Sequence, residues 1–133
     1  MLPSAIRDAL VTHARTDYPN EACGLIVGDR AAAEGGRALR FEPTRNAAAS
    51  PYRYSIDSAD LLRITLATDD ADEVIWGICH SHVRSPARPS PTDVGLAFYP
   101  DALYLIVSLG DMDEPDVRAW RIVEGTVHEV SLS

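Results

Sequence analysis

Two histidines separated by a single serine, His80-Ser81-His82, have the residue types and spacing of a metal-binding pair. They end an apolar run, residues 74–80, that is typical of a buried strand. Residues two apart on a strand project to the same face, about 6.6 Å apart along the backbone. Both imidazoles can therefore reach one zinc ion, whose bonds to histidine nitrogen are about 2.0–2.1 Å long.

A catalytic zinc site takes three protein ligands and keeps one position open for water. The nearest carboxylate downstream of the histidine pair is Asp93, at the expected start of a helix. Two histidines and one carboxylate suit zinc well, so we predict one Zn²⁺ per chain, bound by His80, His82 and Asp93. Arg84 and Arg88 lie in the loop between these ligands. Either guanidinium could bind a substrate carboxylate, although a solvated loop is the simpler interpretation.

A zinc-bound water needs a base that takes its proton and returns it to the leaving amine. Glu21 is the candidate, because it directly precedes an apolar run, residues 22–27, that could form a strand beside the histidine strand. Ser90 could donate its hydroxyl to the oxyanion that develops on the scissile carbonyl. Ser90 is also a favourable helix N-cap, and the two roles can coexist because a capping hydroxyl keeps its own proton.

Length and charge narrow the function classes. The chain has 133 residues, which predicts one domain over residues 1–133. Acidic residues outnumber basic ones by 20 to 12, and this excess argues against binding to nucleic acid. Every basic side chain apart from histidine is an arginine, so a mechanism that uses a Schiff-base lysine is excluded.

The sequence also indicates a cellular compartment. No apolar run is long enough to span a bilayer, and residues 1–7 do not have the pattern of a signal peptide. We therefore expect a cytoplasmic protein with no membrane partner. Cys23 and Cys79 lie in apolar runs typical of buried, reduced thiols, and their roles stay open. Whether two chains pair as a homodimer also stays open.

The hydrophobic pattern predicts an α+β (α/β-like) fold, a mixed central β-sheet flanked by about three helices. Helices are expected over residues 4–16, from residue 57 or 58 to about 68, and from Ser90 onward. Strands are expected over residues 22–27, 37–43, 52–56, 74–80, 103–109, 117–123 and 126–132. The last two strands would form a hairpin.

Together these residues resemble the JAMM (MPN-plus) zinc metalloproteases. The pattern of that family is an upstream Glu, then His-Ser/Thr-His, seven residues, Ser, two residues and Asp. This sequence matches every required position, with Glu21, His80-Ser81-His82, Ser90 and Asp93. The middle segment of the family is also similar, at Asn46, Pro51, Tyr54 and Asp57. The resemblance covers nearly the whole chain.

The resemblance implies an MPN/JAB fold, similar to that of cytidine deaminases. It implies that His80, His82 and Asp93 bind zinc, that Glu21 is the general acid and base, and that Ser90 stabilises the tetrahedral intermediate. The chain is most similar to the short bacterial branch. These enzymes hydrolyse the peptide (or isopeptide) bond after the C-terminal diglycine of a ubiquitin-like (ThiS- or MoaD-like) sulfur-carrier protein and release cysteine or a short extension. The implied substrate is such a carrier, and the implied role is in cysteine biosynthesis.

Two alternatives compete with the peptidase hypothesis. The first is a non-catalytic scaffold of the MPN type, which would typically have lost a ligand or the glutamate. The second is a zinc deaminase, which requires H-x-E followed by P-C-x-x-C. This chain has His80-Ser81-His82 and no such cysteine pair, so the deaminase is excluded.

Overall fold

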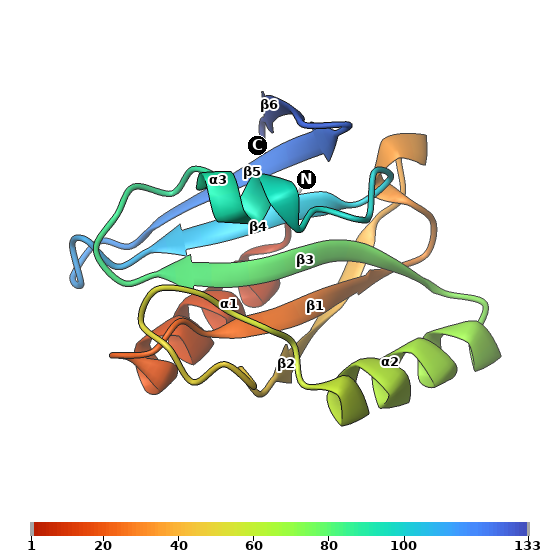
Figure 1. The fold of residues 1–133 in the computed structure, drawn as a ribbon. Coiled ribbons are helices and arrows are strands. Elements are labelled where there is room, and N and C mark those ends of the chain that lie inside the picture. The colour runs from red at the N-terminus through yellow and green to blue at the C-terminus, as the bar shows by residue number, and fades with distance from the viewer. Residues whose placement is uncertain (1, 133) are drawn as a thin grey trace.

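The computed structural model describes residues 2–132, which form a six-stranded mixed sheet flanked by helices (Figure 1). The helical elements are α1 (Ser4–Asp17), the 3-10 turn η1 (Ala32–Glu34), α2 (Ser58–Asp70) and α3 (Pro91–Gly95). The strands are β1 (Cys23–Gly28), β2 (Ala38–Thr44), β3 (Val74–His82), β4 (Leu103–Ser108), β5 (Asp116–Val123) and β6 (Thr126–Val130). The predicted fold class is confirmed. None of these helices is long and apolar enough to cross a membrane.

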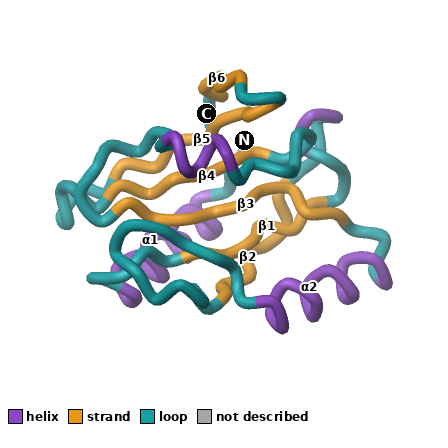
Figure 2. The backbone as a smooth tube through the Cα atoms, in the orientation of Figure 1, coloured by secondary structure: helices purple, strands orange, loops and turns teal. Residues whose placement is uncertain are grey.

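The strand order is β2-β1-β3-β4-β5-β6, and only β3 and β4 are parallel. All the other neighbours are antiparallel. A parallel pair needs a crossover connection, because the chain must return to the starting edge of the sheet. The crossover from β3 to β4 contains α3 and runs in front of the sheet (Figure 2). This connection therefore begins at the end of β3, beside the predicted site.

Side chains alternate between two buried cores, one on each face of the sheet. The first core joins α1 to Ile26, Trp76, Cys79 and Leu105. The second joins α2 to the opposite face, through a set that includes Leu25, Val27, Ile64, Ile78 and Ile106. Neighbouring residues of one strand thus enter different cores, as the two-residue period of a strand requires. Both cysteines are buried and free, in agreement with the sequence prediction.

The predicted strand over residues 52–56 is wrong. This segment makes a single antiparallel bridge, between Asn46 and Ile56. The Asn46 side chain takes the place of strand-to-strand hydrogen bonds. Its Oδ1 accepts from the amides of Ala48 and Ser55. Its Nδ2 donates to the carbonyl oxygens of Glu21 and Arg53. The result is a loop held by one buried amide side chain.

The register of β1 against β3 brings the start of one strand to the end of the other. Cys23 pairs with His80, and the Ser81 amide donates to the Ala22 carbonyl at 3.0 Å. The Ser81 hydroxyl accepts from the Ala22 amide at 2.8 Å, in the interior of the protein. Continued by one residue, this register sets Glu21 opposite His82. The adjacency of the two strands, which the sequence only suggested, is thus present.

We predict that Ser81→Ala lowers the free energy of unfolding by about 1–3 kcal/mol, because the buried Ala22 amide loses its only side-chain acceptor. Urea unfolding of the metal-free proteins measures this difference. Ser58→Ala is the matched control, since Ser58 is exposed on the first turn of α2, and it should change the free energy by no more than about 0.5 kcal/mol. Equal stability of both variants would contradict the prediction.

Candidate metal centre and active site

Three potential ligand atoms converge at the carboxyl end of β3. The Nε2 atoms of His80 and His82 are 3.1 Å apart. Asp93 Oδ2 lies 3.2 Å from His80 Nε2 and 3.1 Å from His82 Nε2. Around a tetrahedral zinc with bonds of about 2.0–2.1 Å, neighbouring ligand atoms are roughly 3.3 Å apart. The triangle therefore has the size that a metal ion of this kind requires.

The protonation of His82 explains why a cation fits between these atoms. His82 Nδ1 lies 2.8 Å from the carbonyl oxygen of Pro86, which can only accept a hydrogen bond. The Nδ1 atom therefore carries the proton of the neutral ring, and Nε2 directs a lone pair at the carboxylate of Asp93. The His82 lone pair and the anionic Asp93 oxygen lie 3.1 Å apart and repel one another unless a positively charged group lies beside both. The donor set thus fits a metal ion.

The His80 ring is held by burial and stacking. His80 has 2% of its surface exposed, and its ring stacks on that of Tyr54 with a centroid separation of 4.3 Å. Burial lowers the pKa of His80, which keeps the ring neutral and able to bind a metal. His80 Nδ1 has no hydrogen-bond partner within residues 2–132. The orientation of this ring is therefore set by packing, whereas that of His82 is set by a hydrogen bond.

Asp93 is positioned by the start of α3. Ser90 is the N-cap, and its hydroxyl oxygen accepts from the Asp93 amide at 3.1 Å. The Asp93 carboxylate accepts in return from the Ser90 amide at 2.9 Å, which completes a capping box. Pro91 occupies the first helical position, as predicted. The same Oδ2 atom thus caps the helix and faces both histidines.

Opposing effects set the charge of Asp93 and His82. Burial raises the pKa of Asp93, but the neighbouring imidazoles of His80 and His82 and the hydrogen bond from the Ser90 amide outweigh this effect and hold the pKa well below its usual range. Burial lowers the pKa of His82, whereas the Asp93 carboxylate and the Pro86 carbonyl stabilise the protonated ring and raise the pKa, and the net shift is upward. The carboxylate of Asp93 is therefore ionised at neutral pH and can bind a cation.

Glu21 lies in the same site and has the environment of a proton acceptor. Its backbone is fixed on both sides, by the Ser50 carbonyl and by the side chain of Asn46. The side chain is 5% exposed, and its Oε1 atom has no hydrogen-bond partner in the described part of the chain. Burial raises the pKa of Glu21 to about 7, against a smaller lowering effect of His82. A carboxylate with this pKa can both take and return a proton near neutrality.

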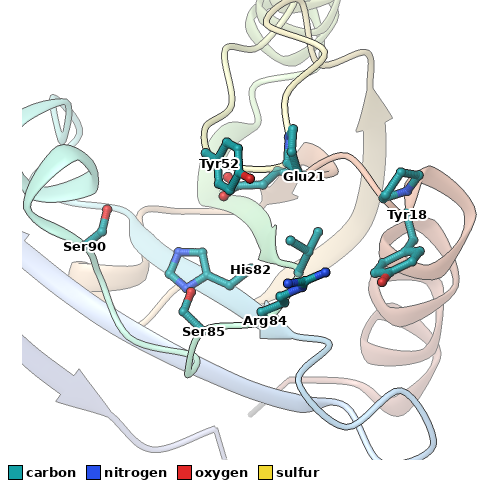
Figure 3. A pocket seen from close by; sticks show the side chains of 10 residues that line it. Tyr18, Glu21, Tyr52, His82, Arg84, Ser85 and Ser90 are labelled. Atoms are coloured by element: carbon teal, nitrogen blue, oxygen red, sulfur yellow. The ribbon is translucent and has the colours of Figure 1, made fainter.

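A cavity of about 420 Å³ opens beside these groups. Its wall includes Glu21, His82, Ser90 and Arg84, and Figure 3 shows these side chains around one hollow. The remaining lining residues are Tyr18, Pro19, Pro51, Tyr52, Val83 and Ser85. The predicted residue Arg88 does not border this cavity. Its guanidinium lies 5.9 Å from the centre of the Trp120 ring instead.

Comparison with known proteins assigns the chain to a family. The model of the prokaryotic homologs of the JAB domain (Prok-JAB) matches residues 3–123. The chain belongs to the Prok-JAB family. This assignment agrees with the predicted resemblance to JAMM proteases.

Two curated relatives of this Prok-JAB protein have the names of enzymes. The CysO-cysteine peptidase of Mycobacterium tuberculosis is 46% identical over 123 residues, which cover 92% of this chain and 82% of the relative. The desampylase of Haloferax volcanii is 36% identical over 112 residues, which cover 80% of this chain and 78% of the relative. The chain is thus a JAB-domain hydrolase.

Solved structures share the fold. A protein from Desulfitobacterium hafniense is 34% identical, with a TM-score of 0.83, and the match covers 97% of this chain and 88% of that protein. A JAB1/MPN domain protein from Archaeoglobus fulgidus is 19% identical, with a TM-score of 0.54 over 96% of this chain and 91% of its own. The expected MPN/JAB fold is therefore confirmed for this Prok-JAB chain.

Some residues of the Prok-JAB site received no role from the sequence. Tyr54 stacks on His80, and Asn46 fixes the backbone of Glu21. Both belong to the middle segment that resembles the family, so the sequence marked their positions without assigning a function. The Pro86 carbonyl, which fixes the His82 tautomer, has no sequence signal because any residue supplies a carbonyl.

The raised pKa of Glu21 predicts a pH-dependent stability difference between the metal-free protein and its Glu21→Gln variant. Between pH 4.5 and about 7, the folded state holds a proton that the unfolded state has released, so the parent loses stability as the pH rises. The variant lacks this loss. The stability of the variant relative to the parent should therefore be roughly 3 kcal/mol greater at pH 8 than at pH 4.5.

Urea unfolding in the presence of a chelator, at several pH values, measures both profiles. Asp93 and His82 titrate in both proteins, so the difference between the profiles reports the titration of Glu21 together with its charge coupling to His82. Parallel profiles across this pH range would show that burial does not perturb Glu21.

Proposed function

We propose that this protein is a zinc-dependent metallopeptidase that hydrolyses the peptide bond after the C-terminal diglycine of a ubiquitin-like sulfur-carrier protein. The product would be the carrier with a free diglycine tail, together with cysteine or a short extension. The observation that carries the proposal is the convergence of His80, His82 and Asp93 within 3.2 Å of one another, beside the buried carboxyl group of Glu21.

His80, His82 and Asp93 would hold the zinc ion, since all three present uncharged nitrogen or ionised oxygen donors. When bound, zinc polarises the scissile carbonyl and makes the attacking water more acidic. Two neutral imidazoles and one carboxylate leave a net positive charge at the centre, which preserves that acidity. The proposal assigns one zinc ion to each chain.

Glu21 would accept one proton from the attacking water and pass it to the leaving nitrogen. The water oxygen becomes part of the new glycine carboxylate, and the second proton leaves when this acid ionises. Ser90 would donate a hydrogen bond from its hydroxyl to the developing oxyanion, because accepting from the Asp93 amide leaves the hydroxyl proton free. All atoms of the hydrolysis are accounted for with water as the only co-reactant.

The relatives support the choice of substrate. The name of the Mycobacterium tuberculosis relative, CysO-cysteine peptidase, describes the hydrolysis of a bond between a protein and cysteine. This agrees with the cysteine release that the sequence resemblance implies. A role in cysteine biosynthesis and a cytoplasmic location are part of the proposal.

An apolar groove next to His80 could receive the tail of the carrier. It is lined by Leu25, Tyr54, Ser55, Ile56, Leu61, Ile78, Leu96, Phe98, Tyr99 and Tyr104. Leu96 and Phe98 are 54% and 73% exposed, which is unusual for large apolar side chains. The Tyr54 ring connects the groove to the metal centre by stacking on His80. An extended tail in this groove would reach the ligands directly.

The backbone along this groove offers unpaired groups for such a tail. The Ala47 amide donates to the Ser55 carbonyl, and the Asp57 amide donates to the Arg45 carbonyl. In an extended segment the backbone N–H and C=O groups of successive residues point to opposite sides. The groups of Tyr54 and Ile56 therefore point away from the segment that contains Arg45 and Ala47. An extended peptide could pair with them by strand addition, with its diglycine approaching the metal centre.

A non-catalytic scaffold is the weaker alternative. It would tolerate loss of the glutamate or of a ligand, whereas this chain keeps all of them and gathers them at one cavity. The buried Glu21, with an unpaired oxygen and a raised pKa, costs stability in the absence of a catalytic use.

The test pairs metal content with cleavage in the parent and in Glu21→Gln. Both proteins should bind about one zinc per chain, because Glu21 is not among the converging ligands. Only the parent should trim a ThiS- or MoaD-like carrier that ends in Gly-Gly-Cys, and the turnover of the variant should fall by at least about 100-fold. Metal analysis and mass spectrometry of the carrier measure the two quantities.

A His82→Gln variant supplies the complementary control, since it should lose both metal and activity. A parent that binds no metal after purification without chelators would overturn the zinc site. A parent that binds zinc and leaves the carrier intact would overturn the substrate assignment.

A further inference from the structure

Arg84 is the only arginine that borders the catalytic cavity. Figure 3 shows its guanidinium in the same hollow as Glu21 and His82. The protein carries a formal net charge of -8, so an anionic substrate group is repelled by most of the molecule. A guanidinium at this point is therefore the local charge that can attract an anion to the scissile bond.

The Arg84 guanidinium also has no partner of its own. Most arginines of this chain donate to a carboxylate or to a backbone carbonyl, as Arg40 does to Glu73 and Arg121 does to Pro100. Within residues 2–132, no hydrogen bond or ion pair engages the Arg84 side chain, although Glu21 lines the same cavity. Arg7, Arg30, Arg53 and Arg88 share this property but lie outside the cavity.

The backbone that carries Arg84 is anchored on both sides. The Leu109 amide donates to the His82 carbonyl at 2.9 Å, and the Ser108 hydroxyl donates to the Ser85 carbonyl at 2.7 Å. Gly110 packs so closely that an added Cβ would lie 3.1 Å from the Arg84 carbonyl oxygen. The guanidinium therefore extends from a fixed point two residues after a candidate metal ligand.

We infer that Arg84 binds the free α-carboxylate of the residue released from the carrier. This inference rests on the proposed function and deepens it, because it makes the enzyme a carboxypeptidase that removes a single C-terminal residue. The planar guanidinium matches a carboxylate with two parallel hydrogen bonds. The aromatic and proline side chains of the same cavity, Tyr18, Pro19, Pro51 and Tyr52, form the walls around the released residue.

This assignment distinguishes between substrates that share the diglycine tail. When the extension is a single residue, only the Cα atom of that residue separates its carboxylate from the nitrogen of the scissile bond. Each further residue moves the carboxylate by about 3.3–3.6 Å, away from Arg84. An isopeptide bond to a lysine side chain brings no free carboxylate to this position. Arg84 thus selects a one-residue extension over longer extensions and over isopeptide-linked proteins.

The test compares two peptides that end in Gly-Gly-Cys, one with a free carboxylate and one with a C-terminal amide. The parent should cleave the acid with a kcat/KM about 10-fold to 100-fold higher than the amide, the range expected for a charge-assisted hydrogen-bonded pair. Arg84→Gln should lose this preference, through a higher KM for the acid and an unchanged rate for the amide. Arg30→Gln is the matched control, because Arg30 is exposed and unpartnered beyond the far end of β1.

The outcomes separate this inference from the proposed function. Equal cleavage of acid and amide by the parent overturns the role of Arg84 and leaves the peptidase intact. An equal loss on both peptides in Arg84→Gln, at normal zinc content, also overturns it, because it indicates a structural effect. If the zinc-loaded parent cleaves neither peptide nor the cysteine-extended carrier, the proposed function fails and this inference fails with it.

Discussion

The antiparallel register of β1 against β3 is the constraint on which the site depends. It pairs Cys23 with His80 and so brings Glu21 beside His82, although the two residues are about sixty positions apart in the chain. Ser81 fixes this register twice, through its amide and through its hydroxyl. A slip of one residue would turn every side chain of the strand to the opposite face and separate the carboxyl group from the histidines.

Around this pair of strands, single polar groups serve both the fold and the site. Asn46 organises a loop in place of a strand and, through the same amide, holds the backbone of Glu21. Ser90 and Asp93 cap a five-residue helix that is too short to be stable alone, and the capping carboxylate faces both histidines. The side chains that organise these loops and this helix are therefore the same ones that shape the candidate site.

The electrostatics of the site follow from burial in an acidic protein. Burial raises the pKa of Glu21 to about 7 and lowers that of His80, while hydrogen bonds keep Asp93 ionised. The centre thus combines neutral nitrogen donors, one anionic oxygen and a carboxyl group that can change its protonation. Arg84 adds a fixed positive charge at the cavity wall. Groups of both charges thus lie close together at one cavity.

The sequence by itself determined the class of the fold and predicted the residues of the candidate site. The spacing of His80, His82, Ser90 and Asp93 is local, within one strand, one loop and one helix start, so strand geometry and capping rules were sufficient to predict it. The helices and most strands followed from hydrophobic periodicity for the same reason.

Only the tertiary structure decided what depends on contacts between distant segments. It decided the pairing of β1 with β3, the replacement of a predicted strand by the Asn46 loop, and the stacking of Tyr54 on His80. It also placed Arg84 at the cavity and Arg88 over Trp120, two arginines that the sequence could not distinguish. Local propensity carries no information about which surface a loop side chain will face, because packing against distant residues sets that direction.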